Sequence, residues 1–470
     1  MSIRKNTLIN LAGAILPMAV MLVTIPLYLK VIGEERYGVL ALVWLVLGYF
    51  SVLEMGLGKA TANQIAKAHD APAQERSEIF WTALLVNAAM GVVGAGILWL
   101  VGDYLINSVL KMPEDFRQEA VAALPWMIAT LPLAMVSSVL NGALEGRNRF
   151  LAVNLLQITS NTIFQIVPLG VAYWLSPSLA WVIPAAVVSR ATMNIFFFLA
   201  CYQYLPLVTK PRVSRGRLRT LFSYSGWVAI SGVAGPLLDT IERFVIGAVL
   251  GASAVTHYTI PMQLACKIKV LPASLARSLF PVFSARTGAD SHDLAIRSTK
   301  MVSSIIAMAV IVAMLALRPF LEVWIGKELA DIAAPIGELI LVGVWANSVA
   351  HIPYFYLQAT GRPDLVAKLH AAELVPYVLL VWLATSEFGL MGVAAIWSIR
   401  CVVEAIILLA MAGLFKKSLA YVAAGFMGVI AAGVALDAVP ILGLTWRIAI
   451  LLICLALALI YARRFNMFKP

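Results

Sequence analysis

Runs of mostly apolar residues, separated by short polar segments, extend along the whole chain. An α-helix needs about 20 such residues to cross the hydrocarbon core of a bilayer, so each run predicts one membrane span. The predicted fold is therefore an all-α polytopic membrane protein with about 14 transmembrane helices. The predicted spans cover residues 7–29, 37–57, 79–101, 120–143, 150–175, 179–201, 220–250, 253–284, 299–321, 333–358, 365–386, 389–412, 418–437 and 444–462.

The composition agrees with this pattern. Of the 470 residues, 61% are hydrophobic and 13% are charged, whereas soluble domains are about 45–50% apolar and about 25% charged. The net charge of +11 does not predict a nucleic-acid partner, because no polar stretch is long enough to form a basic face. The four cysteines lie in apolar segments without metal-ligand spacing, so we expect them to pack in the core.

Lys and Arg residues concentrate in alternate loops. With the N-terminus inside, 22 of the 35 basic residues fall in segments predicted to be cytoplasmic and 7 in segments predicted to be outside. Because Lys and Arg gather in cytoplasmic loops, this asymmetry predicts that both termini are cytoplasmic. The basic loop Lys210–Arg219 is expected to be a cytoplasmic linker that attracts anionic lipid headgroups.

The two halves of the chain share three motifs in the same order. Gly33 and Gly251 are 218 residues apart, Gly146 and Gly361 are 215 apart and each precedes an Arg, and Arg190 and Arg400 are 210 apart. Nearly equal offsets predict two six-helix lobes in parallel repeat, with the substrate between them, plus two extra C-terminal helices. The predicted parts are an N-terminal lobe at 1–205, a linker at 206–219, a C-terminal lobe at 220–413 and two additional helices at 414–470.

Charged residues within the predicted spans are the candidate functional residues. A charge at the centre of a bilayer costs about 2.5–3.5 kcal/mol on insertion scales, so each one needs a partner or a water-filled space. Cations at that depth attract phosphate strongly. The candidates for binding an anionic diphosphate are Lys267, Lys269, Arg190, Arg277, Lys59 and Arg400. The candidates for coupling to H⁺ or Na⁺ are Asp239, Glu242, Glu54 and Glu404.

Each candidate has a structural alternative. Lys269 and Arg277 share one helical face and could line a cavity, or their side chains could extend to the membrane interface. Asp239 could pair with Arg243, and Arg400 with Glu404, as ion pairs that only stabilise a helix. Arg190 has Asn194 at helical spacing and no acidic residue there.

Three segments carry a resemblance to a known family. Residues 54–67, 246–251 and 357–373 resemble the ends of the second, seventh and tenth spans of Wzx-type polysaccharide flippases. Their sequences include EMGLGKA, IGAVLG and LQATGRP. The likeness covers most of the chain and implies membership of the multidrug/oligosaccharidyl-lipid/polysaccharide exporter superfamily.

The resemblance implies a function and a location. It implies transfer of an undecaprenyl-diphosphate-linked oligosaccharide, of the O-antigen or exopolysaccharide kind, across a bacterial inner membrane by alternating access. Polymerase and chain-length proteins of the same pathway are the implied protein partners. One departure counts against peptidoglycan precursor as the substrate: flippases of that lipid carry an Arg in the first span, and here no charge lies between Lys5 and Lys30.

Two other functions stay open at this point. A multidrug or cation exporter of the same superfamily would have an acidic or aromatic cavity, whereas the candidates here are basic. A membrane polymerase acting on the lipid-linked glycan would need a large outer loop, and the longest predicted outer loop, 102–119, is short. The sequence has no phosphate-binding Gly-Lys-Ser/Thr loop and no cluster of metal ligands, so we expect neither an enzyme nor a bound cofactor.

Overall fold

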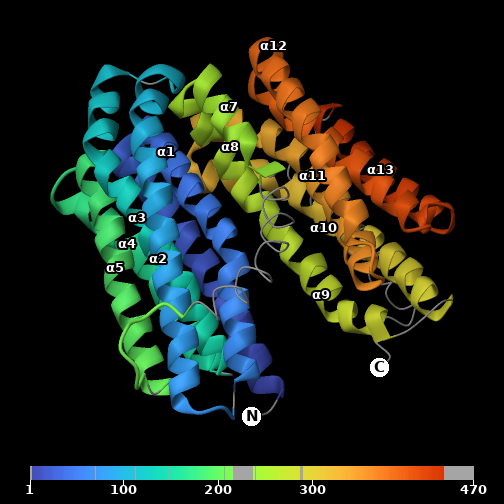
Figure 1. The fold of residues 1–470 in the computed structure, drawn as a ribbon. Coiled ribbons are helices and arrows are strands. Elements are labelled where there is room, and N and C mark those ends of the chain that lie inside the picture. The colour runs from blue at the N-terminus through green and yellow to red at the C-terminus, as the bar shows by residue number, and fades with distance from the viewer. Residues whose placement is uncertain are drawn as a thin grey trace. The chain divides into compact units, whose positions relative to one another are not determined.

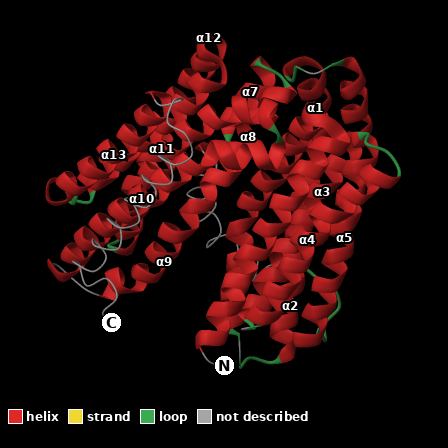
Figure 2. Ribbon diagram, turned by 180° about the vertical axis from the view of Figure 1, so that it is seen from behind, coloured by secondary structure: helices red, strands yellow, loops and turns green. Residues whose placement is uncertain are grey.

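The computed structural model describes the backbone of residues 3–68, 70–111, 113–147, 149–205, 207–214, 237–238, 240–285 and 289–438. Within these ranges the regular structure is entirely helical, as the apolar pattern predicts (Figures 1 and 2). The helices are α1 (Ile3–Lys67), α2 (Ala73–Tyr104), α3 (Glu114–Gly146), α4 (Phe150–Trp174), α5 (Leu179–Tyr204), α7 (Ile241–Val249), α8 (Ala252–Ala265), α9 (Val270–Ala285), α10 (Ala289–Ile325), α11 (Lys327–Ala359), α12 (Pro363–Met411) and α13 (Phe415–Ala438). A short π-helix, η1 (Leu105–Val109), follows α2, and a 3₁₀ turn, η2 (Cys266–Lys269), separates α8 from α9.

Nine of the helices in the described ranges are long and apolar enough to cross a membrane. Two of these segments bend sharply at a glycine with positive φ, α1 at Gly33 (φ 81°) and α12 at Gly389 (φ 61°). In α12, His370 before the bend contacts Glu404 after it, so the two arms of α12 lie side by side. Each bent segment thus covers two of the predicted spans. The first half of span 220–250 and the span 444–462 lie outside the described residues.

The predicted span 253–284 is one helical path that tightens in the middle. Pro272 lacks the N–H that would bond to the carbonyl of Ile268 four residues earlier. The chain makes a 3₁₀ turn at Cys266–Lys269 just before this gap, and 3₁₀ geometry commonly marks such interruptions. Lys267 and Lys269 therefore sit in the interrupted part of the path.

The chain divides into two compact units, Met1–Thr256 and His257–Pro470. In the first unit, α7 packs on the earlier helices: the backbone N–H of Lys111 donates to the carbonyl of Gly247, at 3.1 Å. The hydroxyl of Thr256 donates to the carbonyl of Glu34, at 2.6 Å. The predicted boundary at 206–219 stays a prediction. Gly33 and Gly251, paired by the sequence repeat, both have positive φ, at 81° and 93°.

Helices α1 and α3 approach closely through paired glycines. A Cβ at Gly142 would overlap the carbonyl oxygen of Gly58, and a Cβ at Gly58 would overlap the hydroxyl of Ser138. Only glycine leaves room for the backbones to come this near, which is a common device where helices pack inside membranes. This contact brings the face of α3 that carries Ser138 and Gly142 next to α1.

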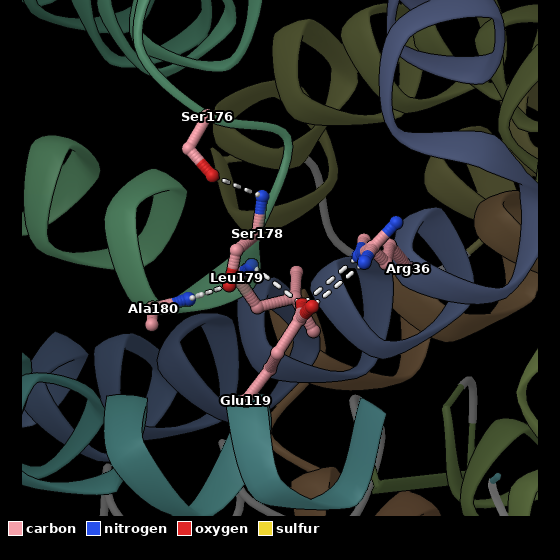
Figure 3. Close-up of polar contacts among 6 residues, drawn as sticks. All are labelled: Arg36, Glu119, Ser176, Ser178, Leu179 and Ala180. Atoms are coloured by element: carbon pink, nitrogen blue, oxygen red, sulfur yellow. Dashed lines mark hydrogen bonds and ion pairs between the residues drawn. The ribbon is translucent and has the colours of Figure 1, made fainter. Parts of the chain in front are cut away.

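A half-buried ion pair fixes the start of α5 to two other helices (Figure 3). Arg36 of α1 donates two hydrogen bonds to the carboxylate of Glu119 in α3, at 2.9 and 2.7 Å. Glu119 Oε2 also accepts the backbone N–H of Leu179, at 2.9 Å, and Ser178 caps the same helix by accepting from Ala180. The side chains of Arg36 and Glu119 are 23% and 17% exposed. The pair joins three helices of the first unit.

We expect Arg36→Gln to lower the free energy of unfolding by about 1–3 kcal/mol, because it leaves the half-buried Glu119 charge without its bidentate partner. The matched control is Arg117→Gln, also a partner of an α3 carboxylate. Arg117 pairs with Glu114, which is 65% exposed, so about 0.5 kcal/mol or less is expected there. Unfolding of the purified protein in mixed micelles measures both. Equal effects of the two substitutions would contradict the role given to Arg36.

Candidate functional site

A polar cavity of about 550 Å³ lies within the first unit. Its walls come from α1, α3, α4 and α5, and most of the lining side chains carry a hydroxyl, an amide or a charge. The lining residues are Gly58, Ser137, Ser138, Asn141, Gly142, Glu145, Gln157, Ser160, Asn161, Phe164, Arg190, Asn194 and Phe197. Amides and hydroxyls in such number are unusual for an apolar helix bundle and make a surface that can be hydrated.

Helical spacing explains how these side chains come to one place. Positions 137, 141 and 145 in α3 are four residues apart, as are 157 and 161 in α4 and 190 and 194 in α5, so each set lines one face of its helix. Hydrogen bonds join the face of α3 to each of the other two faces. Ser137 donates to the side-chain oxygen of Asn194 at 2.6 Å, and Gln157 donates to that of Asn141 at 3.1 Å.

Arg190 is the cation among the residues that line this cavity. It is half-buried and lies eleven residues into α5, which is about 16 Å along the helix and close to the middle of a membrane. The opposite side of α5 is apolar and exposed, with Val188 at 53% and Ile195 at 60%. The helix therefore presents one face to lipid and the other to the cavity.

The two predicted lysines of the second unit have different surroundings. Lys267 is exposed. Lys269 is half-buried, and its ammonium lies over the indole ring of Trp397, 5.9 Å from the ring centroid. A cation held over an indole face is stabilised by the ring quadrupole. The 3₁₀ turn gives the two lysines different directions, as the sequence spacing predicts for residues two apart.

Arg400 lies in a buried ionic cluster formed by the two arms of α12. Its Nη1 is 3.7 Å from Glu373 Oε2 and 3.8 Å from Glu404 Oε2. The ring Nε2 of His370 is 3.2 Å from Glu404 Oε1. The predicted Arg400–Glu404 pair is confirmed, although the helix-only interpretation is incomplete, because Glu373 and His370 join it from the other arm. An arginine that faces two carboxylates is poorly suited to bind a further anion.

The remaining predicted residues are placed only in part. Glu242 of α7 is fully buried and its Oε1 is 3.9 Å from the Nε of the adjacent Arg243. Asp239 lies outside the described residues, so its pairing with Arg243 stays a prediction. The side chains of Glu54, Lys59 and Arg277 also lie outside the description.

Basic side chains crowd together where α3 ends and α4 begins. Burial lowers the pKa of the Arg147 guanidinium, and the nearby charges of Arg76 and Arg149 lower it further, while Asp70 acts in the opposite direction. The guanidinium of Arg149 lies over the ring of Tyr204, 4.6 Å from its centroid. Three guanidinium groups thus lie near one another at this end of the first unit.

Sequence reasoning missed the neutral lining of the cavity and the role of His370. The signal for the first was present: polar residues recur at helical spacing along three spans in a row, 137–145, 157–161 and 190–194. The signal for the second was weaker, because His370 and Glu404 are 34 residues apart and meet only across the bend at Gly389. Within the described residues no group of His, Cys, Asp and Glu could hold a metal ion.

Comparison with known proteins assigns the chain to a family. Residues 3–287, more than half of the chain, match the family described as "Polysaccharide biosynthesis protein". The "Putative O-antigen transporter" of Shigella flexneri is 26% identical over 420 residues, which cover 87% of this chain and 97% of that protein. The teichuronic acid biosynthesis protein TuaB of Bacillus subtilis is 22% identical, over 76% of this chain and 71% of TuaB.

Solved structures show the same fold. An inward-facing multidrug resistance MATE family transporter of the MOP superfamily superposes with a TM-score of 0.70 and 16% identity, over 87% of this chain and 98% of that chain. This likeness confirms the predicted all-α polytopic membrane fold, while the predicted count of about 14 helices stays a prediction. The two relatives are named as an O-antigen transporter and a teichuronic acid biosynthesis protein. The chain is a multi-pass membrane protein that belongs to the polysaccharide biosynthesis protein family and has the fold of the MOP superfamily transporters.

Proposed function

We propose that this protein is a flippase that moves an undecaprenyl-diphosphate-linked oligosaccharide repeat unit across the bacterial inner membrane by alternating access. The repeat unit is of the O-antigen or exopolysaccharide kind, and both termini of the chain are cytoplasmic. The O-antigen and teichuronic acid relatives support a lipid-linked glycan as the substrate. Polymerase and chain-length proteins would receive the product.

The observation that carries the proposal is the polar cavity of the first unit. Its volume of about 550 Å³ falls in the usual range of ligand pockets, about 300–1,000 Å³. Hydroxyl and amide side chains donate to and accept from sugar hydroxyls, and Asn141, Gln157 and Asn161 supply three such amides. A sugar of one or two rings would fit this lining, with the lipid tail remaining in the bilayer.

Arg190 supplies the charge that an anionic substrate needs. A guanidinium at mid-membrane depth attracts a diphosphate far more strongly than it would in water, and its planar fork matches two phosphate oxygens. We propose that Arg190 binds the diphosphate in the first unit, and that Lys267 and Lys269 bind anionic substrate within the second unit. Lys59 and Arg277 remain candidates for the same role.

We expect Arg190→Gln to reduce transfer of a fluorescent lipid-linked glycan between the leaflets of liposomes by about tenfold or more, the equivalent of one lost charge-assisted contact. Arg190→Lys should restore part of the rate, because it keeps the charge without the fork. Thr192→Ala, on the exposed side of the same helix, is the control and should transfer at the wild-type rate. Full activity of Arg190→Gln would remove the cavity cation from the mechanism.

Replacing Lys267 and Lys269 together with Gln should abolish transfer in the same assay, because both cations of the 3₁₀ turn are lost. The matched control is the double replacement of Lys416 and Lys417 with Gln, which removes the same charge from the start of α13. If the first double variant transfers as fast as the control, the 3₁₀ turn has no part in substrate binding.

Water should reach the cavity but not the opposite face of α5. In a background without the native cysteines, we expect Asn161→Cys to react with a membrane-impermeant charged thiol reagent in liposomes. Thr192→Cys is also exposed, yet its neighbours Val188 and Ile195 are apolar, so lipid should protect it. Equal reactivity of the two cysteines would show that the cavity is not a separate aqueous space.

The transport assays also address the alternative. A multidrug or cation exporter of the superfamily would transfer a cationic dye and leave the lipid-linked glycan in its original leaflet. The basic character of Arg190, Lys267 and Lys269 favours the anionic substrate.

A further inference from the structure

A second buried polar site lies in the second unit, apart from the residues proposed to bind the glycan. It consists of His370 and Glu373 on the first arm of α12 and Arg400 and Glu404 on the second arm. Their side chains are 9%, 12%, 8% and 8% exposed. Glu373 is ten residues after Pro363 and Arg400 is eleven after Gly389, so both lie about 15 Å from the helix ends, at mid-membrane depth.

The charges of this cluster do not balance. With both glutamates ionised and His370 neutral, two negative charges face one guanidinium. Burial in a region of low dielectric makes such an excess charge costly, because water does not screen it. One added proton brings the cluster to neutrality.

The distances show which of the two carboxylates has fewer partners for its negative charge. Both carboxylates approach the same nitrogen of Arg400, at 3.7 and 3.8 Å, which exceeds hydrogen-bond distance. Neither oxygen of Glu373 and only one oxygen of Glu404 has a hydrogen-bond donor among the described residues. A protonated Glu373 would lose its repulsion with Glu404 and gain an O–H that can donate.

Neighbouring groups among the described residues do not remove the imbalance. Within the described ranges, the ionisable groups that act on Glu373 are Glu404, Arg400 and His370. From α11, the neutral ring of Tyr354 stacks on His370 with centroids 6.1 Å apart. The guanidinium of Arg400 lies over the ring of Tyr377, 5.1 Å from its centroid. The ammonium of Lys269 lies over Trp397, one turn of helix before Arg400.

We infer that the His370–Glu373–Arg400–Glu404 cluster is a proton-binding site that takes up one hydrogen ion from water, with Glu373 as the acceptor. The step adds a proton to a carboxylate oxygen and forms a carboxyl O–H, and no other bond changes. The use of this proton to drive transport rests on the proposed function, whereas the binding of the proton does not. A site of this kind makes the net charge of the second unit depend on pH.

Infrared spectroscopy of the full-length protein in liposomes tests the binding without any substrate. From about pH 5 to about pH 9, we expect a carbonyl band of a protonated carboxyl group that fades as the pH rises. Glu373→Gln should lack this band. Glu387→Gln, an exposed carboxylate on the same arm of α12, should retain it. Persistence of an unchanged band in Glu373→Gln would overturn the inference.

A second variant keeps the test decisive if Glu373→Gln does not fold. In Glu404→Gln the charges of Glu373 and Arg400 balance, so the band should move to lower pH by about one unit or more. An unchanged midpoint in that variant would equally contradict the inference.

Transport in liposomes tests the coupling. An imposed pH gradient should accelerate glycan transfer by the wild type and by Glu387→Gln, and should leave Glu373→Gln unaffected. If the band titrates as expected and no glycan moves, the proposed function fails and the proton site stands. If glycan moves and no band is lost in Glu373→Gln, the proton site fails and the flippase stands.

Discussion

The structure depends on one constraint: a charge held at membrane depth needs a partner or a hydrated space. The described part of the chain meets this constraint in two ways. Arg190 lines a cavity of hydroxyls, amides and the carboxylate of Glu145, whereas Arg400 lies near two glutamates. The first arrangement leaves a cation beside room for a ligand, and the second uses the cation to hold acids in the interior. The same residue type therefore serves two purposes, decided by its surroundings.

The helical architecture could be predicted from the sequence because membrane spans are a matter of length and apolar content. The repeat anchors were informative as well: Gly33 and Gly251, matched by motif and offset in the sequence, share a positive φ. The sequence could not predict that residues on separate arms meet across a bend. His370 and Glu373 join a cluster with Arg400 and Glu404 only because α12 bends back on itself at Gly389.

The sequence identifies the charged residues of the candidate site more readily than the neutral polar ones, for a physical reason. Intramembrane charges stand out in an apolar sequence, so Arg190, Arg400 and Glu404 were identified directly. Neutral polar residues such as Asn141 and Gln157 stand out less, since serine and asparagine also occur in helix packing. Their importance follows from the shared cavity into which three helices place them. The side chains of Lys59, Glu54 and Arg277 and the whole of Asp239 lie outside the described residues, and their roles stay predictions.

The central claim is that the cavity beside Arg190 holds the charged, sugar-bearing end of a lipid-linked glycan. Substrate protection measures this most directly, in liposomes that contain the Asn161→Cys protein. The lipid-linked glycan should slow modification of this cysteine by a charged thiol reagent, and the added Arg190→Gln substitution should remove the protection. Modification at the same rate with and without the glycan would contradict the account.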